Sequence, residues 1–370
     1  MALQPQTPSL DYTGLEYRWK NFVFRPAEFQ KEAVFAGMLG LLMLVYFLGK
    51  KWNEQKARAW WSTFDPLYSS QFRAMSPLPN QPLVTNSPST HLHYLTGRRN
   101  LLSLHTVLNL LPRHNAVQYI QDLVWGVVDP VNELGDELVL DYTLGENGKG
   151  QLGEGVGVWG VVRKSGVLTK IRKERWDVTF CKTVENPQIP PTHMLLTESA
   201  DSTDYLLNAP NVGLLDVLKN ERTGGLLKSL IITDQPTTRP TRGPLPESAR
   251  SRHLIITLRL PPNGRYEETM PWVQVGLNLC DLMGKVAMKP ETTRKLRKTR
   301  QEVSDELARS YAAEQKEENG DPEEEKKAAK RKEEAKRRAA MSDVERKKLE
   351  LKEQKKQQRK AQIKQLKGGK

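Results

Sequence analysis

The chain has 370 residues, and its formal net charge of +13 lies almost entirely at one end. From Lys326 to Lys370 there are 19 Lys and Arg residues against 6 Asp and Glu, whereas the first 325 residues carry 38 of each sign. The two cysteines, Cys181 and Cys280, exclude a disulfide framework and a zinc ribbon. No Asn-X-Ser/Thr sequon is present, and both features favour a reducing, cytosolic location for most of the chain.

The first predicted element is a transmembrane helix within residues 32–51. Ala33 to Gly49 is an uncharged run of seventeen residues between Lys31-Glu32 and Lys50-Lys51, at the short end of what spans a bilayer. A cleaved signal peptide would lie closer to the start of the chain, and a buried core helix would show a polar face. The residues predicted to span the membrane include Ala33, Phe35, Leu39, Leu42, Val45 and Leu48.

The charges that flank this run do not decide its orientation. Four basic residues precede it and four follow it closely, so the positive-inside count is a tie. The cysteine, sequon and tail arguments favour a short luminal segment, residues 1–31, with the remainder cytosolic. Aromatic residues suited to the interface stand near both ends of the run: Tyr17, Trp19, Tyr46 and Trp52.

After the span we expect a juxtamembrane helix that extends to Phe72, followed by a proline-rich linker; together they comprise residues 52–90. Aromatic residues of the helix are expected to form a face that lies at the membrane interface or in a protein core. A cytosolic α+β domain, residues 91–290, is then expected to fold as an independent unit. Its predicted helices are Arg98–Leu111, Asn115–Val124, a basic helix ending near Trp176, Leu214–Asn220 and Thr269–Met288. Its predicted strands are Glu137–Leu144, Val156–Val162, one near Met194, Lys228–Thr233 and Leu254–Leu260.

Residues 291–370 form a charged tail with two predicted helix starts, at Asp321 and Ser342. Such a basic block favours a polyanion, either RNA or an anionic lipid surface, although a merely solvated helix is the alternative. The residues predicted to contact ribosomal RNA are Arg337, Arg338, Arg346, Lys347, Lys348, Lys355, Lys356, Arg359 and Lys360.

Two patterns resemble functional motifs without their usual context. Gly155, Gly157 and Gly160 match GxGxxG, but they fall within a predicted strand, where glycines allow close strand approach. His91 and His93 share a strand face without a third ligand nearby, which favours core or surface histidines over a metal site. No nucleophile, phosphate-binding or zinc motif occurs, so we expect a protein that is not an enzyme and has no cofactor.

Three segments, in this order, carry a resemblance to a known family: "AVFAGMLGLLMLVYFLGKKWNEQKARAWW", "LLSLHTVLNLLPRHNAVQYIQDLV" and "HLIITLRLPPNGRYEETMPWVQVGLNLCDLMGKV". The chain resembles the calumin family, the coiled-coil-domain-containing endoplasmic reticulum membrane subunit of the PAT complex, and within it a fungal relative. The resemblance extends from the membrane helix to the C-terminus.

This resemblance implies a non-enzymatic factor of membrane-protein biogenesis in the endoplasmic reticulum. It implies a small multi-pass intramembrane chaperone, the Sec translocon and the ribosome as partners, besides membrane lipids. Animal members carry a long acidic luminal segment linked to calcium binding, whereas only about 31 residues precede the span here, which argues against calcium storage. The alternative is a membrane-tethered adaptor that binds RNA or lipid and has no part in insertion.

Overall fold

The computed structural model describes residues 14–19, 22–75, 83–128, 134–145, 155–246, 250–286 and 288–319, and Glu333. The chain divides into two compact units. The first comprises residues 1–239 and 245–299, and the second comprises residues 240–244 and 300–370. Within the second unit, Gly243 has φ +81° and lies against the ring of Tyr311. The sheet, the helices α1–α7 and the contacts described below belong to the first unit.

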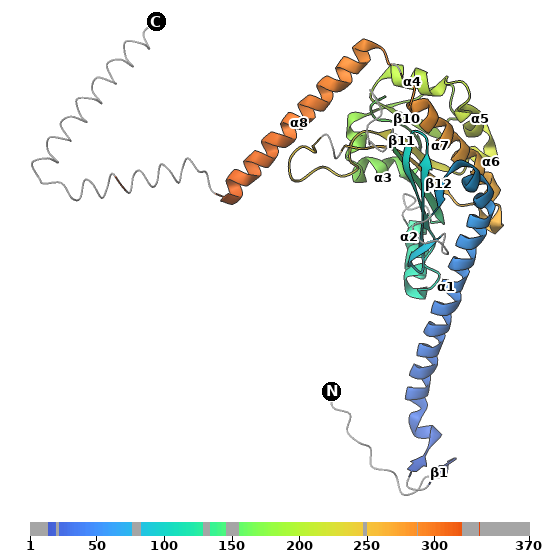
Figure 1. Ribbon diagram of the computed structural model, residues 1–370. Coiled ribbons are helices and arrows are strands. Elements are labelled where there is room, and N and C mark those ends of the chain that lie inside the picture. The colour runs from blue at the N-terminus through green and yellow to red at the C-terminus, as the bar shows by residue number, and fades with distance from the viewer. Residues whose placement is uncertain are drawn as a thin grey trace, which may run out of the picture. The chain divides into compact units, whose positions relative to one another are not determined.

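The centre of the first unit is an antiparallel sheet in the order β3-β5-β6-β7-β12-β11-β8-β10-β9, with β4 also paired to β5. A separate two-stranded hairpin, β1–β2, precedes the first helix (Figure 1). The strands are β1 Tyr17–Trp19, β2 Phe22–Phe24, β3 Ala74–Met75, β4 Val84–Ser87, β5 Thr90–Arg98, β6 Leu101–Asn109, β7 Glu137–Leu144, β8 Trp159–Arg163, β9 Lys182–Val184, β10 His193–Thr197, β11 Leu227–Thr233 and β12 Arg252–Arg259.

Among the helices α1 differs from the others, because it extends beyond the sheet toward the hairpin (Figure 1). The α-helices are α1 Gln30–Gln71, α2 Ala116–Val128, α3 Gly166–Glu174, α4 Ala200–Leu207, α5 Leu214–Lys219, α6 Glu221–Gly224, α7 Met270–Met283 and α8 Pro290–Asn319. Short 3-10 helices are η1 Pro26–Phe29, η2 Asp177–Phe180, η4 Pro262–Gly264 and η5 Tyr266–Thr269.

The main core lies between one face of the sheet and helices α1 and α7. In β7 every second residue is buried, as expected for a strand with one face toward a core. Tyr142 on this strand donates a hydrogen bond to the carbonyl oxygen of Val273 in α7 (3.4 Å). Gly276 lies directly against the Tyr142 ring, where a Cβ would come within 2.6 Å. A smaller apolar cluster joins β8, β10 and β11 to α3 and η2.

The predicted α+β class is confirmed, and the strand pairs described are all antiparallel. The predicted strands Glu137–Leu144, Lys228–Thr233 and Leu254–Leu260 correspond to β7, β11 and β12, and the strand near Met194 corresponds to β10. The four predicted helices other than Arg98–Leu111 correspond to α2, α3, α5 and α7. The continuation of the first helix to Phe72 is also confirmed, ending at Gln71.

The predicted helix Arg98–Leu111 is wrong, because this segment forms the end of β5 and strand β6. Its leucines recur every three or four residues, yet the buried residues of the regular part are Leu104, Thr106 and Leu108, which alternate. Two features concealed this alternation. A register shift between Leu101 and Ser103 breaks it, and the buried residue between two leucines is a threonine.

Two further expectations need correction. The strand predicted at Val156–Val162 begins only at Trp159, because Gly157 adopts a φ of +75° just before it. The predicted linker contains strand β4, which pairs with β5, while residues 76–82 lie outside the described part. The aromatic face of the juxtamembrane helix lies in the domain core: Trp60, Phe64 and Tyr68 are each fully buried.

Candidate membrane-anchoring site

The first half of α1 is apolar and exposed. Among the described residues, α1 alone is long and apolar enough to cross a membrane. Large apolar side chains from Val34 to Leu48, apart from Val45, are 40–69% exposed. Of the residues predicted to span the membrane, Ala33, Phe35, Leu39, Leu42 and Leu48 are exposed and Val45 is half-buried. Their contact with lipid stays a prediction.

Burial begins abruptly at Gly49 and continues along one face of the same helix. The buried positions of α1 recur every three or four residues: Gly49, Asn53, Ala57, Trp60, Phe64 and Tyr68. A Cβ on Gly49 would lie only 2.2 Å from the carbonyl oxygen of Arg113, so the helix and the segment before α2 approach more closely than any larger residue permits. One unbroken helix therefore leaves the apolar span and enters the domain core.

Four polar residues fasten this helix to the domain just beyond the exposed stretch. We call Asn53, Lys56, Arg113 and Asp136 the helix–domain joint. Arg113 donates two hydrogen bonds to the Asp136 carboxylate, both 2.9 Å, and a third to Oδ1 of Asn53 (3.0 Å). Lys56 Nζ donates to the same carboxylate (2.8 Å). The joint thus connects α1 to the segment before α2 and to the start of β7.

Backbone groups complete the joint. Nδ2 of Asn53 donates to the carbonyl oxygens of Pro88 and Leu111, each at 3.0 Å, and Asn53 is fully buried. The backbone N–H of Leu111 donates to the Asp136 carboxylate (2.8 Å). A buried polar group without partners would destabilise the fold, whereas here Asn53, Arg113 and Asp136 each have more than one partner and Lys56 is paired with Asp136.

The electrostatics of the joint favour an ionised Asp136. Burial alone raises the pKa of this carboxyl group, but hydrogen bonds from Arg113, Lys56 and the Leu111 backbone outweigh burial and hold the pKa below its usual value. The carboxylate is therefore charged at neutral pH, and two cations compensate it. Because both cations and the carboxylate are largely shielded from water, their attraction is screened less than that of a surface pair.

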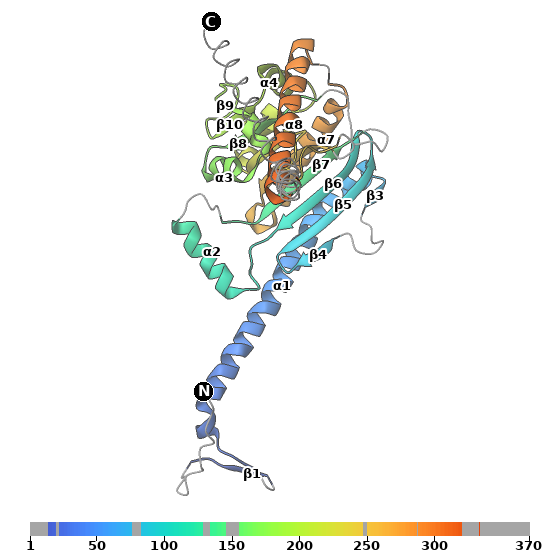
Figure 2. The same cartoon turned by 90° about the vertical axis from the view of Figure 1, so that its left-hand side faces the viewer.

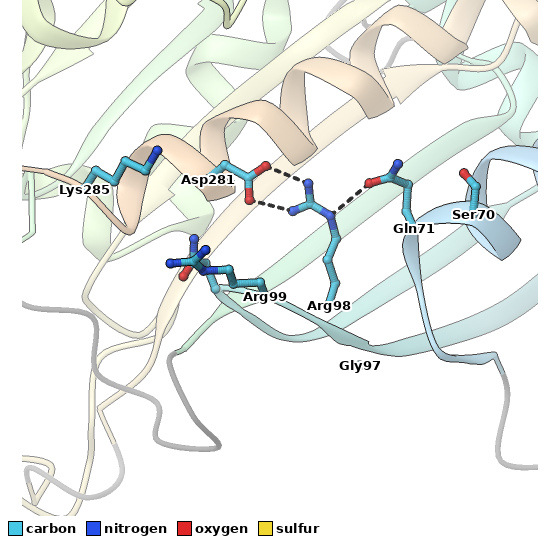
Figure 3. A pocket seen from close by; sticks show the side chains of 8 residues that line it. Ser70, Gln71, Gly97, Arg98, Arg99, Asp281 and Lys285 are labelled. Carbon is cyan, nitrogen blue, oxygen red and sulfur yellow. Dashed lines mark hydrogen bonds and ion pairs between the residues drawn. The ribbon is translucent and has the colours of Figure 1, made fainter.

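A second polar contact holds the far end of α1. Arg98 of β5 forms two hydrogen bonds with Asp281 of α7 (3.0 and 2.7 Å) and one with Gln71 of α1 (3.3 Å), as Figure 3 shows. These residues line an open hollow of about 420 Å³ that also includes Ser70, Gly97, Arg99, Asn100 and Lys285. The contact joins α1, β5 and α7. The second half of α1 is therefore held at both ends, by the helix–domain joint and by Arg98.

His91 and His93 are core residues on β5. They are 1% and 2% exposed, and the described residues contain no group of three metal-ligating side chains. His93 packs against the rings of Trp61 (4.2 Å between centroids) and Tyr68 (5.9 Å). Burial lowers the pKa of His93 to about 4, so the imidazole is neutral in the folded protein.

This buried histidine makes stability fall on acidification. Between its unfolded pKa of 6.5 and its folded pKa of about 4, the unfolded chain binds a proton that the folded chain does not. We expect the free energy of unfolding to fall by about 2 kcal/mol from pH 7 to pH 5 through this group. Urea unfolding of the detergent-solubilised chain should show that His93→Phe removes this part of the pH dependence. The matched control, His105→Phe, changes an exposed residue of β6 and should retain the pH dependence. If the free energy of unfolding depended on pH equally in both variants, His93 would not be the group responsible.

The glycine motif does not form a phosphate-binding turn. Gly160 lies inside β8, where a Cβ would come within 2.7 Å of the Leu230 carbonyl oxygen of β11, so close strand approach accounts for it. Gly155 and Gly157 precede the strand, whereas a dinucleotide motif follows one. The nine basic residues predicted to contact RNA, from Arg337 to Lys360, lie outside the described residues.

Sequence reasoning missed the joint. Its members are a lone asparagine and lysine after the span, an arginine next to a predicted helix and an aspartate before a strand, spread over more than 80 residues. The one local signal was Asn53, a polar residue on the same face as Trp60, Phe64 and Tyr68. A polar residue in line with an apolar face indicates a buried hydrogen-bonding position.

Comparison with known proteins supports the resemblance found in the sequence. A similar protein is the UPF0674 endoplasmic reticulum membrane protein of Schizosaccharomyces pombe, 27% identical over 241 residues, which are 63% of this chain. The match spans 60% of that relative's length, less than two thirds. The family model of PAT complex subunit CCDC47 matches residues 28–360, which include α1, the joint and the whole sheet apart from the separate hairpin. On this match over most of its length, the chain belongs to the PAT complex subunit CCDC47 family.

Proposed function

We propose that this protein is a non-enzymatic membrane protein of the endoplasmic reticulum that assists insertion and folding of multi-pass membrane proteins at the ribosome-bound Sec translocon. Family membership and the endoplasmic reticulum relative support a role in membrane-protein biogenesis. The observation that carries the proposal is the continuity of α1, which is exposed and apolar in its first half and part of the domain core in its second. A domain attached in this way is held at the membrane surface in a defined orientation.

In this proposal α1 spans the membrane once, residues 1–31 are luminal, and the domain and tail are cytosolic. The partners are a small multi-pass intramembrane chaperone, the Sec translocon and ribosomal RNA. The tail supplies the ribosome contact, because 19 basic residues between Lys326 and Lys370 give it a net charge of +13. Cations that neutralise RNA phosphates release counterions, so this binding should weaken steeply with salt and show little sequence preference.

Ribosome sedimentation tests the tail. We expect the detergent-solubilised full chain to co-sediment with ribosomes at low salt, and a chain that ends at Glu325 to lose most of this binding. A full-length chain in which the nine predicted residues, Arg337 to Lys360, are replaced by Gln keeps the length and lowers the net charge of residues 326–370 from +13 to +4. It should behave like the truncated chain.

The outcome also separates the two functions considered. Co-sedimentation that is equal for all three chains would show that the tail does not contact the ribosome. Ribosome binding without translocon subunits in complexes isolated from endoplasmic reticulum membranes would favour a tethered RNA-binding adaptor over a role in insertion.

A further inference from the structure

Helix α2 presents an apolar face that nothing in the described structure covers. Val117, Ile120, Val124, Val127 and Val128 recur at helical spacing on one side and are 55–82% exposed. All of α2 is described, and none of its thirteen residues is buried. An apolar face of this size is unusual on a surface that meets only water.

The other sides of α2 are different. Ala116, Tyr119, Asp122 and Gly126 are half-buried and also recur at helical spacing, so this side lies toward the rest of the protein. Gln118 and Gln121 are exposed and form a polar side together with Trp125, which follows Gln118 by two turns. The helix is thus amphipathic, and Asp122 is its one charged residue.

The segment before α2 fixes where the helix begins. This segment carries Arg113, whose backbone packs against Gly49 of α1 and whose side chain belongs to the joint. The His114 ring packs against Tyr46, 5.9 Å between centroids, at the last exposed turns of the apolar stretch. Asn115 then caps α2 by accepting a hydrogen bond from the backbone N–H of Gln118 (3.2 Å). Figure 2 shows α2 running away from α1, below the sheet and on the side where the exposed part of α1 leaves the domain.

We propose that α2 lies in the membrane interface, parallel to the bilayer surface, with its valine and isoleucine face among the lipid acyl chains of the leaflet from which α1 emerges. Two observations select lipid as the occupant. The apolar face begins just after the segment that packs on the last exposed turns of α1, where His114 contacts Tyr46, so the exposed apolar surfaces of the two helices adjoin; and the exposed face consists of Val and Ile side chains without a charge. The inference rests on α1 being the membrane span of the proposed function.

The composition of α2 sets this attachment apart from that of the basic tail. No Lys or Arg occurs in α2, so its binding needs no anionic headgroups and should not weaken with salt. Two points of attachment, α1 and α2, prevent the domain from rotating about the axis of α1.

Spin-label accessibility of the full chain in phosphatidylcholine vesicles tests the proposal. Single cysteines are introduced at Val124 or Val127 on the apolar face, with Gln118→Cys as the matched control on the polar face; the native cysteines are buried. We expect labels at 124 and 127 to collide several-fold more with oxygen, and several-fold less with a water-soluble nickel chelate, than the label at 118. These ratios should be the same at low and high salt.

Each other outcome overturns the inference. Equal chelate access at 118, 124 and 127 would place the apolar face in water. Exclusion of both reagents, with dipolar coupling between labels, would show that a second copy of the chain covers it. A Leu42→Cys label in α1 separates the two proposals. If that label is in the bilayer and those of α2 are not, only the inference about α2 fails; if it is in water, the proposed function fails as well.

Discussion

A fragment comprising residues 91–299 is expected to lack a cooperative unfolding transition, whereas residues 50–299 should unfold as one unit. The shorter fragment begins where the sequence pattern places the start of the domain, but it omits Trp60, Phe64 and Tyr68, each 0% exposed. Loss of one buried aromatic side chain costs about 3–5 kcal/mol. Three such losses, about 9–15 kcal/mol together, are as large as the total stability of an ordinary domain, about 5–15 kcal/mol.

Circular dichroism and urea unfolding of both fragments provide the measurement. In residues 50–299, Phe64→Ala should lower the free energy of unfolding by about 3–5 kcal/mol. The matched control is Trp52→Ala on the same helix, which changes a side chain 59% exposed and should have little effect. A cooperative transition in residues 91–299, with the same denaturant dependence as the longer fragment, would contradict the assignment of α1 to the core.

The second large effect is expected at the joint. Asp136→Ala leaves Arg113 and Lys56, with side chains 17% and 22% exposed, and the Leu111 backbone N–H without their shared acceptor. Removing one partner of a shielded ion pair typically costs about 3–5 kcal/mol, because the remaining charge stays partly desolvated. We expect a loss of this size in urea unfolding of the detergent-solubilised full chain at pH 7.

Asp216→Ala, which removes an exposed carboxylate in α5, is the control and should change stability by at most about 0.5 kcal/mol. The wild-type advantage over Asp136→Ala should also shrink as the pH falls below about 4. The pKa of Asp136 is lower in the folded chain, so its contribution to stability is full above the unfolded pKa and is lost as the pH falls through the folded pKa. Similar midpoints for the two variants at neutral pH would mean that the joint does not hold the helix.

The two halves of α1 illustrate what the sequence predicts well. The uncharged run from Ala33 to Gly49 identifies the helix, and the aromatic residues that follow it, Trp60, Trp61, Phe64 and Phe72, predict that it continues. The sequence leaves open whether those aromatic residues face lipid or a protein core. Both environments remove apolar surface from water, and so both select the same residue types. Only the packing of Trp61 and Tyr68 on His93 of β5 decides between them.

The joint and β6 show the limits of prediction. Arg113 and Asp136 meet because β6 and β7 pair in one register, with Asn109 opposite Glu137, and no local pattern encodes that register. In β6 itself, a register shift and buried Thr106 imitate helical spacing. Both features depend on partners distant in sequence, whereas periodicity reports only on neighbours.

One helix serves as the proposed membrane span and as part of the domain core, and this has a consequence for folding during synthesis. Trp60, Phe64 and Tyr68 leave the ribosome directly after the span, but α7, which also packs into their core cluster, follows about 200 residues later. At about 5–20 residues per second, synthesis of these 200 or so residues takes roughly 10–40 s. If α1 spans the membrane as proposed, the aromatic face lies next to the bilayer during that time without the rest of its core, and the headgroup region offers the nearest favourable environment for Trp and Tyr. On the proposed membrane attachment, folding of the domain transfers the second half of α1 from the lipid surface onto the sheet, and its core is complete only when α7 has been synthesised.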